Sequence, residues 1–504
     1  MCELPIGHDR LHERSLSVRR FTLFQDPLAV LCGSAVLAVL LSACATVPAP
    51  QRARPTLTSG EAAAIDAFVA QALVASEGVG ASVSVFKDGV VLLEKAYGSR
   101  SLDPAVPATV DTPFALASVS KQFTVGCLLL LVDDGRVSVS DPVSKWFPSL
   151  TRASDITLLD LINHVSGYRD YYPLNYVDRR MLQATTVDEV VARYAGGPLD
   201  FEPRSRMSYS NTGYLILGRV VELISGEPLG TFIARRIFGP LGMTHSEYLE
   251  EGSPPASETL LATRAKGYGR FALGPTKPVV SEAAGWLGGA AAIWSTASDL
   301  SKWQRALVTG TLLSRSSFAL MMQPRTLISG AVSHYGGGLS VMFKEDAPAF
   351  SHSGALNGFR SYNVFDVRGT SVVMLTNFDE FNPATVASKI FEFIRPRPSL
   401  PLVKGPSPVE VVRTLMAQLQ AGAVDRNQFT EDFAQYLNTE RLRDAKEALS
   451  GLGLPTKIEL REAFERGGLA GAEVKVGYES AVLLVTLYRR SDGTIEEFSV
   501  SRDL

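Results

Sequence analysis

The stretch from residue 114 to residue 135 restricts the fold of this chain more than any other, and its sequence is FALASVSKQFTVGCLLLLVDDG. No proline occurs between Ser118 and Val132, the second half is mostly apolar, and Gly135 follows two aspartates. This pattern predicts a buried helix that ends at the glycine, with Ser118 in its first turn. Residues three apart lie on one face of a helix, so the Ser118 hydroxyl and the Lys121 amine can meet. The stretch thus places a nucleophile beside a candidate base, and the free N–H groups of a helix start can stabilise an oxyanion.

A second serine and lysine at the same spacing show that the pattern alone is weak. Ser84 and Lys87 lie in residues 81–98, ASVSVFKDGVVLLEKAYG, where alternating apolar residues and a Lys-Asp-Gly turn predict a β-hairpin. On a strand, side chains three residues apart point to opposite faces. For Ser118 the alternative is an ordinary serine at a helix start with a surface lysine nearby. The catalytic interpretation therefore needs further motifs.

Composition limits the classes of protein that this chain can belong to. Its 504 residues are 46% hydrophobic, enough for one large domain and a smaller one. Lys plus Arg number 49 against 52 Asp plus Glu, so no strong positive field points to nucleic acid. Cys2, Cys32 and Cys44 precede the predicted folded part, which leaves Cys127 without a partner for a disulfide. No Cys or His cluster has zinc spacing, and we predict no metal or other cofactor, with a carboxylate-bound metal left open.

An apolar leader precedes the predicted folded part. Two arginines come before an uncharged, mostly apolar run over residues 27–43, and Leu-Ser-Ala-Cys occupies residues 41–44. The run is short for a membrane-spanning helix and suits the core of a signal peptide. An uncleaved membrane anchor with an incidental cysteine is the alternative, and both interpretations place the protein outside the cytoplasm. Acidic residues in the long segment before the run favour a translation start downstream of Met1.

The sequence Leu-Ser-Ala-Cys resembles the lipobox of bacterial lipoproteins. This resemblance implies that residues 1–44 hold a lipoprotein signal peptide, with cleavage before Cys44 and a lipid on that cysteine. Position 45 is alanine rather than aspartate, which in enteric-type sorting favours the outer membrane. We therefore expect a lipid-anchored protein of the cell envelope, on the periplasmic face of the outer membrane. Residues 45–60 are rich in Pro, Ala and Thr and would form a flexible tether.

The remaining chain divides into two predicted domains. Residues 61–395 begin with a helical segment and a hairpin and end in strand-like runs joined by Gly- or Asp-containing turns. They predict an α/β (α+β) fold with an antiparallel sheet flanked by helices. Residues 396–408 are rich in proline and form a predicted linker. Residues 409–504 show helical spacing followed by strands, which predicts a small α+β domain; without a catalytic constellation, it suits packing or partner docking better than independent catalysis.

A second motif, Tyr209-Ser210-Asn211, lies in a polar loop before an apolar helix predicted over residues 214–224. Loops held by a rigid helix are common places for catalytic groups. The alternative is an ordinary helix start in which Asn211 satisfies backbone donors. Tyr436-Leu437-Asn438 repeats the pattern near the other end of the chain. The spacing therefore needs the context of the other motifs.

The third motif is His352-Ser353-Gly354, followed by Ala355, within a predicted strand. A glycine on an inner strand allows another backbone or a carbonyl to approach closely. The alternative for His352 is a structural imidazole that hydrogen-bonds the backbone. The triplets Lys87-Asp88-Gly89 and Lys475-Val476-Gly477 show how common a basic residue two positions before glycine is.

Taken together and in this order, the three motifs resemble the serine β-lactamase and penicillin-binding protein superfamily, in its class C, D-peptidase and esterase branch. The resemblance covers about residues 61–395 and implies the β-lactamase/transpeptidase-like fold, an antiparallel sheet with a mostly helical subdomain. Further segments resemble the family at the expected places: ITLLDLINHVSGY, MSYSNTGYLILG, IFGPLGMTHSEY and GGAAAIWSTASDLSKW.

The resemblance implies a catalytic role for Ser118, Lys121 and Tyr209. Ser118 would be the acylating nucleophile, Lys121 its partner in proton removal, and Tyr209 a proton shuttle to the leaving group and helper of the deacylating water. A free lysine has a pKa of about 10.4, so Lys121 as a base requires burial or a positive neighbour. Residues expected to contact substrate or form the oxyanion hole with the Ser118 N–H are Asn211, His352, Gly354 and Ala355.

One departure from the family pattern bears on the substrate. Many β-lactamases carry Lys-Thr-Gly where this chain has His352-Ser353-Gly354, and histidine is a less reliable cation near neutral pH. We therefore expect a serine hydrolase of amides or esters acting through an acyl-enzyme, on small peptides such as D-amino-acid peptides of the cell wall, rather than an efficient β-lactamase. The alternative is a slow-acylating sensor or scaffold that binds cell-wall peptides or β-lactams. His164, in the family-like NHVSGY segment, is assigned to structure.

Overall fold

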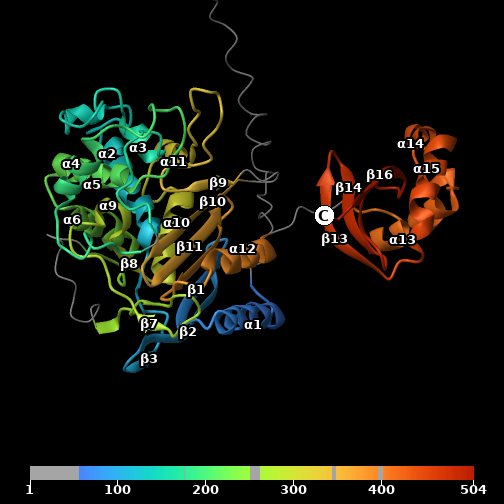
Figure 1. Cartoon of the computed structure of the whole chain (residues 1–504), viewed down its shortest axis with the longest axis horizontal. Helices are drawn as coiled ribbons and strands as arrows, with labels where there is room; N and C mark the ends of the chain where they lie inside the picture. Colours follow the sequence, from blue (N-terminus) through green and yellow to red (C-terminus); the bar gives the residue numbers. More distant parts are fainter. Residues whose placement is uncertain (1–55, 175, 250–261, 343–347, 396–400, 504) are drawn as a thin grey trace, which may run out of the picture. The chain divides into compact units, whose positions relative to one another are not determined.

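The computed structural model describes residues 56–503 except 175, 250–261, 343–347 and 396–400 (Figure 1). The predicted signal peptide, the lipobox and most of the predicted tether lie outside the described residues. Within the described ranges, no helix is both long enough and apolar enough to cross a membrane.

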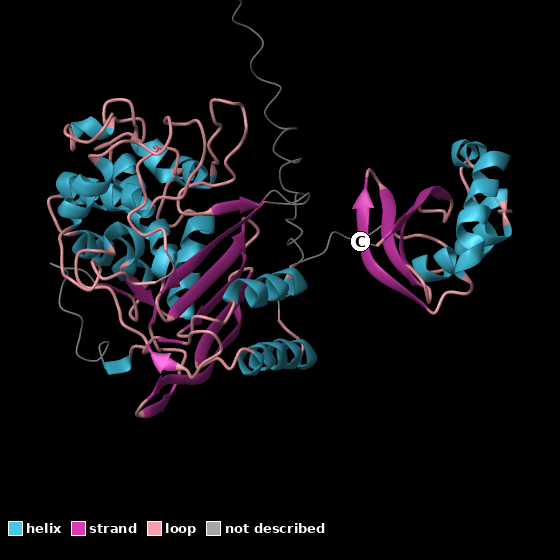
Figure 2. Ribbon diagram, viewed as in Figure 1, coloured by secondary structure: helices cyan, strands magenta, loops and turns pink. Residues whose placement is uncertain are grey.

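A seven-stranded antiparallel sheet forms the centre of the first domain (Figure 2). Its order is β3-β2-β1-β12-β11-β10-β9, so β1, near the start of the domain, pairs with β12, near its end. This pairing brings strands from both ends of the domain together, which the sequence did not predict. The strands are β1 (Gly80–Lys87), β2 (Val90–Leu102), β3 (Ala105–Pro107), β9 (Ser340–Met342), β10 (Ala349–Leu356), β11 (Phe359–Asp366) and β12 (Thr370–Thr376).

Two helices, α1 (Ser59–Ala75) and α12 (Pro383–Ile394), cover one face of this sheet (Figure 1). Val83 and Val85 of β1 pack in their core, whereas α10 (Ala297–Thr309) contacts the opposite face. The predicted helix start near Glu61 is slightly late. The helix begins at Ser59, because the Thr58 hydroxyl and the Glu61 carboxylate cap its first turn reciprocally.

The helical subdomain lies against the other side of the sheet. Its central helix, α2 (Lys121–Asp133), is buried around its whole circumference from Lys121 to Leu131, as its apolar sequence predicts. The neighbouring helices are α3 (Leu158–Ile162), α4 (Val187–Ala195), α5 (Asn211–Ser225), α6 (Leu229–Ile233), α7 (Gly239–Leu241), α9 (Gly288–Ala291) and α11 (Arg315–Met322). Short strands form the sheets β4-β8-β5, of Phe114–Ala115, Ile293–Ser295 and Glu247–Tyr248, and β6-β7, of Tyr268–Gly269 and Lys277–Pro278.

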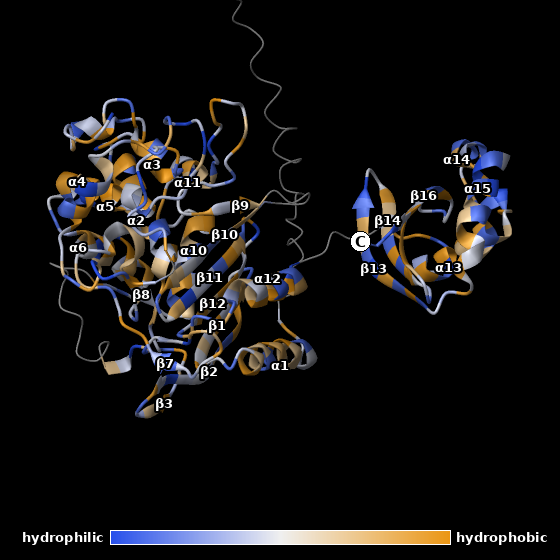
Figure 3. Cartoon of the chain, in the orientation of Figure 1, coloured by the Kyte–Doolittle hydropathy of each residue, from blue (hydrophilic) through white to orange (hydrophobic). Residues whose placement is uncertain are grey.

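The C-terminal part is a separate α+β unit with its own core. A four-stranded antiparallel sheet in the order β13-β14-β15-β16 packs its apolar side chains with those of α13, including Val412, Leu415 and Val474. Figure 3 shows hydrophobic and hydrophilic residues on different parts of α13 and of these strands. The predicted helices and strands are confirmed as α13 (Pro408–Ala421), α14 (Glu431–Tyr436), α15 (Thr439–Leu449), β13 (Lys457–Arg466), β14 (Leu469–Gly477), β15 (Val482–Arg489) and β16 (Ile495–Arg502).

Candidate active site

Ser118 lies in a short 3₁₀ turn, Ala117–Ser120, that runs directly into α2. The predicted α-helical turn is therefore wrong in detail, because α2 itself begins at Lys121. Ala117 adopts a left-handed backbone with φ of 50°, a conformation that non-glycine residues adopt rarely and at a cost. Ser118 is half-buried while its neighbours on both sides are buried. In this turn, Ser118 is thus the residue that is partly accessible to solvent between buried neighbours.

The Lys121 amine has three oxygen partners. Its Nζ lies 3.2 Å from Ser118 Oγ, 2.7 Å from Asn211 Oδ1 and 3.0 Å from the carbonyl oxygen of Ala290 in α9. An amide oxygen and a carbonyl oxygen can only accept hydrogen bonds, whereas a serine hydroxyl can also donate. A neutral Lys121 that donates to Asn211 and Ala290 therefore directs its lone pair at the Ser118 hydroxyl, which is the geometry of a general base.

Burial adjusts the protonation of Lys121 to this task. The side chain is fully buried, and desolvation lowers its pKa to about 7, while the negative charge of Asp170 acts in the opposite direction. The ammonium nitrogen lies 4.9 Å from the ring centre of Tyr209 and 5.4 Å from that of Tyr214, which offsets part of the cost of its charge. Near neutral pH, a large share of Lys121 is thus neutral and able to accept a proton.

Asp170 determines which way the Asn211 amide faces. Its Oδ1 accepts hydrogen bonds from the Asn211 backbone N–H at 3.0 Å and from Asn211 Nδ2 at 3.1 Å. Because the amide nitrogen faces this carboxylate, the amide oxygen must face Lys121. Asp170 was not singled out from the sequence. Its position, two residues after the end of the family-like segment at Tyr168, was the only signal in the sequence.

Tyr209 lies beside Lys121 on a loop that His164 holds. The centre of the His164 ring lies 4.2 Å from that of the Tyr209 ring, with the two planes tilted by 37°, and His164 Nδ1 accepts a hydrogen bond from the Ser210 backbone N–H at 3.1 Å. Burial raises the pKa of Tyr209 well above 10, although the nearby Ser118 hydroxyl opposes the shift. Tyr209 therefore stays a neutral phenol near pH 7 and can act only as a proton donor or relay. His164 thus contacts Tyr209 and Ser210 without lining the pocket, and its assignment to structure stays a prediction.

His352 points away from the pocket. It is only 5% exposed; its Nδ1 lies 2.6 Å from the Ser353 carbonyl oxygen and its Nε2 lies 2.8 Å from the Tyr335 hydroxyl. The carbonyl requires a proton on Nδ1, so Nε2 accepts from Tyr335. Burial and the nearby Lys121 charge lower the pKa of His352 to about 3. The imidazole is therefore neutral, and the structure does not bring it onto the pocket wall, where substrate contact was predicted.

Of the other two predicted residues of the third motif, Ala355 lines the pocket, whereas Gly354 does not and lies on β10 against the nucleophile turn. On β10 the side chains of Ser353 and Ala355 are exposed, whereas Gly354 is buried against the nucleophile turn. A Cβ atom at Gly354 would lie 2.2 Å from the Leu116 carbonyl oxygen and 2.2 Å from Ser361 Oγ. Only glycine allows β10 to approach the Ser118 turn this closely. The backbone of Ala355 therefore runs alongside Ser118.

Some of these residues border a pocket of about 700 Å³, whose lining does not include Lys121, His352 or Gly354. The residues predicted from the sequence that line it are Ser118, Tyr209, Asn211 and Ala355. Its other lining residues are Tyr168, Arg169, Asp170, Tyr171, Tyr172, Pro173, Leu174, Asp200, Ser208, Leu287, Ala291 and Leu356. Within the described residues, no three His, Cys, Asp or Glu side chains are grouped to hold a metal ion.

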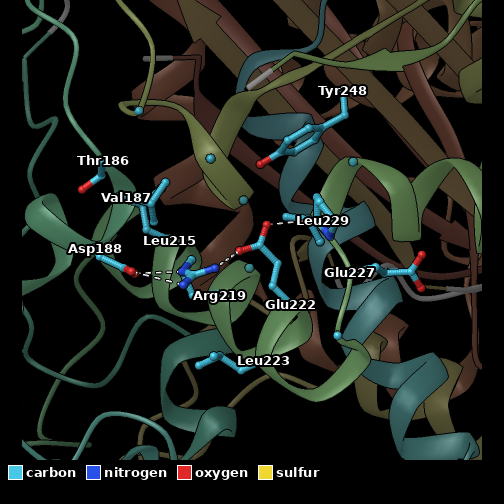
Figure 4. A pocket seen from close by; sticks show the side chains of 17 residues that line it. Thr186, Val187, Asp188, Leu215, Arg219, Glu222, Leu223, Glu227, Leu229 and Tyr248 are labelled. Carbon is cyan, nitrogen blue, oxygen red and sulfur yellow. Dashed lines mark hydrogen bonds and ion pairs between the residues drawn. The ribbon is translucent and has the colours of Figure 1, made fainter. Parts of the chain in front are cut away.

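A second hollow, of about 570 Å³, shares helix α9 with the first (Figure 4). Gly288 and Gly289 line this hollow, whereas Ala291 lines the serine pocket. Figure 4 shows the Arg219 guanidinium between the carboxylates of Asp188 and Glu222, which form ion pairs with it. Ser118 lines the first pocket and not this hollow, so the candidate chemistry belongs to the first pocket.

Comparison with known proteins agrees with this geometry. A family model described as Beta-lactamase matches residues 65–392. A D-aminopeptidase of Brucella anthropi is 28% identical over 325 residues, which span 63% of this chain and 60% of the aminopeptidase. A D-amino acid amidase of Ochrobactrum anthropi SV3, solved in complex with L-phenylalanine amide, is 26% identical with a TM-score of 0.55, over 66% of this chain and 100% of the amidase.

An octameric penicillin-binding protein homologue of Pyrococcus abyssi shares the fold, with a TM-score of 0.58 and 19% identity over 87% of this chain and 99% of its own. The predicted fold class is thereby confirmed. The individual roles given to the site residues stay predictions. Since the family model covers well over half of its length, this chain belongs to the beta-lactamase family, and its predicted class, a serine hydrolase, is confirmed.

Proposed function

We propose that this chain hydrolyses amide bonds of small D-amino-acid peptides or amides through an acyl-enzyme on Ser118. The observation that carries the proposal is the Lys121 amine, buried among two obligate acceptors and the Ser118 hydroxyl. The names of the aminopeptidase and amidase relatives support amides of D-amino acids as the substrate class. Esters with good leaving groups would be accepted by the same chemistry.

Acylation begins when neutral Lys121 takes the Ser118 proton as Oγ attacks the substrate carbonyl carbon. The C–O bond forms while the carbonyl electrons move to oxygen, where the backbone N–H groups of Ser118 and Ala355 stabilise the charge. Tyr209 passes a proton to the leaving nitrogen and regains one from Lys121, and the C–N bond breaks. Water then attacks the ester carbonyl carbon while Lys121 accepts its proton, and Lys121 returns that proton to Ser118 Oγ as the C–O bond breaks.

The neutral His352 supports an amide or ester substrate over a β-lactam. Where Lys-Thr-Gly places a cation near a substrate carboxylate, this chain has a buried imidazole that points at Tyr335. A carboxylate bound there would lose its hydration without gaining an ion pair. We therefore expect weak β-lactam hydrolysis.

The test compares Ser118→Ala with Ser84→Ala in the full chain, using p-nitrophenyl esters and D-alanine p-nitroanilide. Turnover should fall at least ~10³-fold in Ser118→Ala, with an initial burst and a mass adduct on Ser118 in the unmodified chain. Ser84→Ala, which removes the same group from a serine that bonds Ser301, should keep turnover within about twofold. Turnover that survives Ser118→Ala contradicts the proposal. An adduct that lasts for hours without product would favour the slow-acylating sensor instead.

We further propose that the chain is anchored in the cell envelope by a lipid on Cys44, on the periplasmic face of the outer membrane. The Leu-Ser-Ala-Cys sequence after an apolar run supports this location. Mass spectrometry of the mature N-terminus should find a diacylglyceryl group on Cys44 and no residue before it. Cys44→Ala should release the protein from membranes, whereas Cys32→Ala, within the leader, should not.

A further inference from the structure

The charged side chains of the serine pocket leave one carboxylate without a cation. Arg169, Asp170 and Asp200 are the pocket-lining residues with formal charge. Arg169 pairs with Asp200, with Nη2 3.0 Å from Oδ1. Asp170 forms no ion pair with any side chain in the described part of the chain, and the groups that hydrogen-bond it are neutral N–H donors. Asp170 therefore brings to the pocket wall a negative charge that no ion pair neutralises, and Lys121, which feels this charge, does not line the pocket.

The Asp170 carboxylate is held in a fixed orientation with one oxygen left largely free. Oδ1 receives the Asn211 and Tyr172 backbone N–H groups at 3.0 and 3.1 Å, together with Asn211 Nδ2 at 3.1 Å. Oδ2 lies 3.2 Å from that same Asn211 Nδ2, which it shares with Oδ1. A carboxylate has room for about four hydrogen bonds. Oδ2 thus keeps acceptor capacity at the wall of the pocket.

Neither Lys121 nor His352 is positioned to hold a substrate carboxylate instead, and the pocket-lining Arg169 is already paired with Asp200. The Lys121 amine already has three hydrogen-bond partners, which are Ser118, Asn211 and Ala290. His352 is buried and bonded through both ring nitrogens. The pocket is therefore electrostatically suited to a positive group and unsuited to a negative one.

Asp170 is also close to the reacting atoms. One amide links it to the base, because Asn211 contacts Lys121 through Oδ1 and Asp170 through Nδ2. In an amino-acid amide, the α-ammonium is attached to the carbon next to the scissile carbonyl. A group that binds this ammonium must therefore lie within one side chain of the nucleophile and base, as Asp170 does.

We propose that Asp170 binds the α-ammonium of the substrate, which makes this enzyme an aminopeptidase or amidase for substrates with a free amino terminus. The inference rests on the proposed acyl-enzyme function and names the substrate class of that same site. It gives Asp170 two tasks: its Oδ1 orients Asn211, and its Oδ2 recognises the ammonium. It also predicts that N-acylated peptides and carboxylate-bearing β-lactams are poor substrates.

The test uses three substrates in the full chain at pH 7. They are D-alanine p-nitroanilide, its N-acetyl derivative, and p-nitrophenyl propionate, which lacks the ammonium. Asp170→Asn should lower kcat/KM for the free amine by ~10- to 100-fold relative to the ester, mainly through KM. The N-acetyl anilide should change in proportion to the ester. Asp155→Asn, at an exposed ion pair outside the pocket, should change none of these ratios.

Equal losses on all three substrates would overturn the proposal and leave Asp170 with the orientation of Asn211 alone. An unmodified chain that prefers the N-acetyl anilide would overturn it as well. If the ester is not hydrolysed, the acyl-enzyme function has failed, and a binding measurement still decides the role of Asp170. In a Ser118→Ala background, calorimetry should detect D-alanine amide binding that Asp170→Asn weakens at least tenfold; unchanged affinity would refute ammonium recognition.

Discussion

The chain contains two serine-lysine pairs of identical spacing, and the fold separates them completely. Lys121 reaches Ser118 at 3.2 Å because a 3₁₀ turn and a helix place both side chains on one side. In strand β1, by contrast, Ser84 bonds Ser301 of α10, and Lys87 donates to the carbonyl of Ile394 at the end of α12. These helices cover opposite faces of the sheet. The spacing carries chemistry only when the backbone period brings the two groups together.

The other two motifs show the same contrast between a site and a chance copy. Asn211 bonds Lys121, whereas Asn438 of the second Tyr-x-Asn accepts the Arg441 backbone N–H and caps α15. Gly354 lets β10 approach the nucleophile turn, whereas a Cβ atom at Gly477 would meet nothing closer than 3.5 Å. For each motif, the chance copy elsewhere in the chain therefore provides a matched position for a control substitution.

The largest expected effect separates the two lysines. Lys121→Met removes the base and should lower ester turnover by ~10²- to 10⁴-fold. Because methionine fills a similar volume without a buried amine, the melting temperature should stay the same or rise. Lys87→Met should leave turnover unchanged, since its amine donates to the Ile394 carbonyl at the end of α12 and does not line the pocket. Stopped-flow assays and thermal melts check both, and full activity of Lys121→Met would end the assignment of Lys121 as base.

Next in size is the effect of a methyl group at the two glycines. Gly354→Ala must push β10 away from Leu116, which costs about 1–3 kcal/mol of stability and, for a shift of about 1 Å, ~10²-fold in rate. Gly477→Ala has ordinary van der Waals space and should be nearly neutral in both respects. Denaturant melts and kcat/KM values for the two variants measure the difference. Equal behaviour would mean that the close approach of β10 is dispensable.

Substitution of Asn211 should affect mainly turnover, whereas substitution of Asn438 should affect mainly stability. Asn211→Ala removes an acceptor that orients the neutral Lys121 amine and should lower turnover ~10-fold, because a hydrogen bond between neutral groups contributes about 0.5–1.5 kcal/mol. Asn438→Ala removes a helix cap and should cost about 1 kcal/mol of unfolding free energy, with turnover unchanged. Paired kinetic and unfolding measurements test this division; it breaks down if Asn438→Ala loses activity while folded.

Local sequence patterns predicted the elements of the fold but not the electrostatics of the site. The apolar run after Lys121 predicted α2, and the alternation around Lys87 predicted the hairpin, because both depend on neighbours along the chain. The Ala290 carbonyl and Asp170 reach Lys121 and Asn211 from distant segments, so no local period marks them. His352 was expected to contact substrate. His352 is buried against Tyr335 because of how β10 packs, and the three-residue motif does not determine that packing.

The smallest expected effect is a shift in pH dependence that again distinguishes the two lysines. Ester hydrolysis should rise with pH along a limb centred near 7, because only neutral Lys121 accepts the serine proton and burial lowers its pKa to about 7. The Asp170 charge favours the protonated lysine, so Asp170→Asn should lower this pKa further and move the limb to lower pH. Glu61 is the acidic neighbour of Lys87, and Glu61→Gln should leave the limb in place. Profiles of kcat/KM between pH 5 and 9 measure the effect of both variants. If Asp170→Asn leaves the position of the limb unchanged, a group other than Lys121 titrates in acylation.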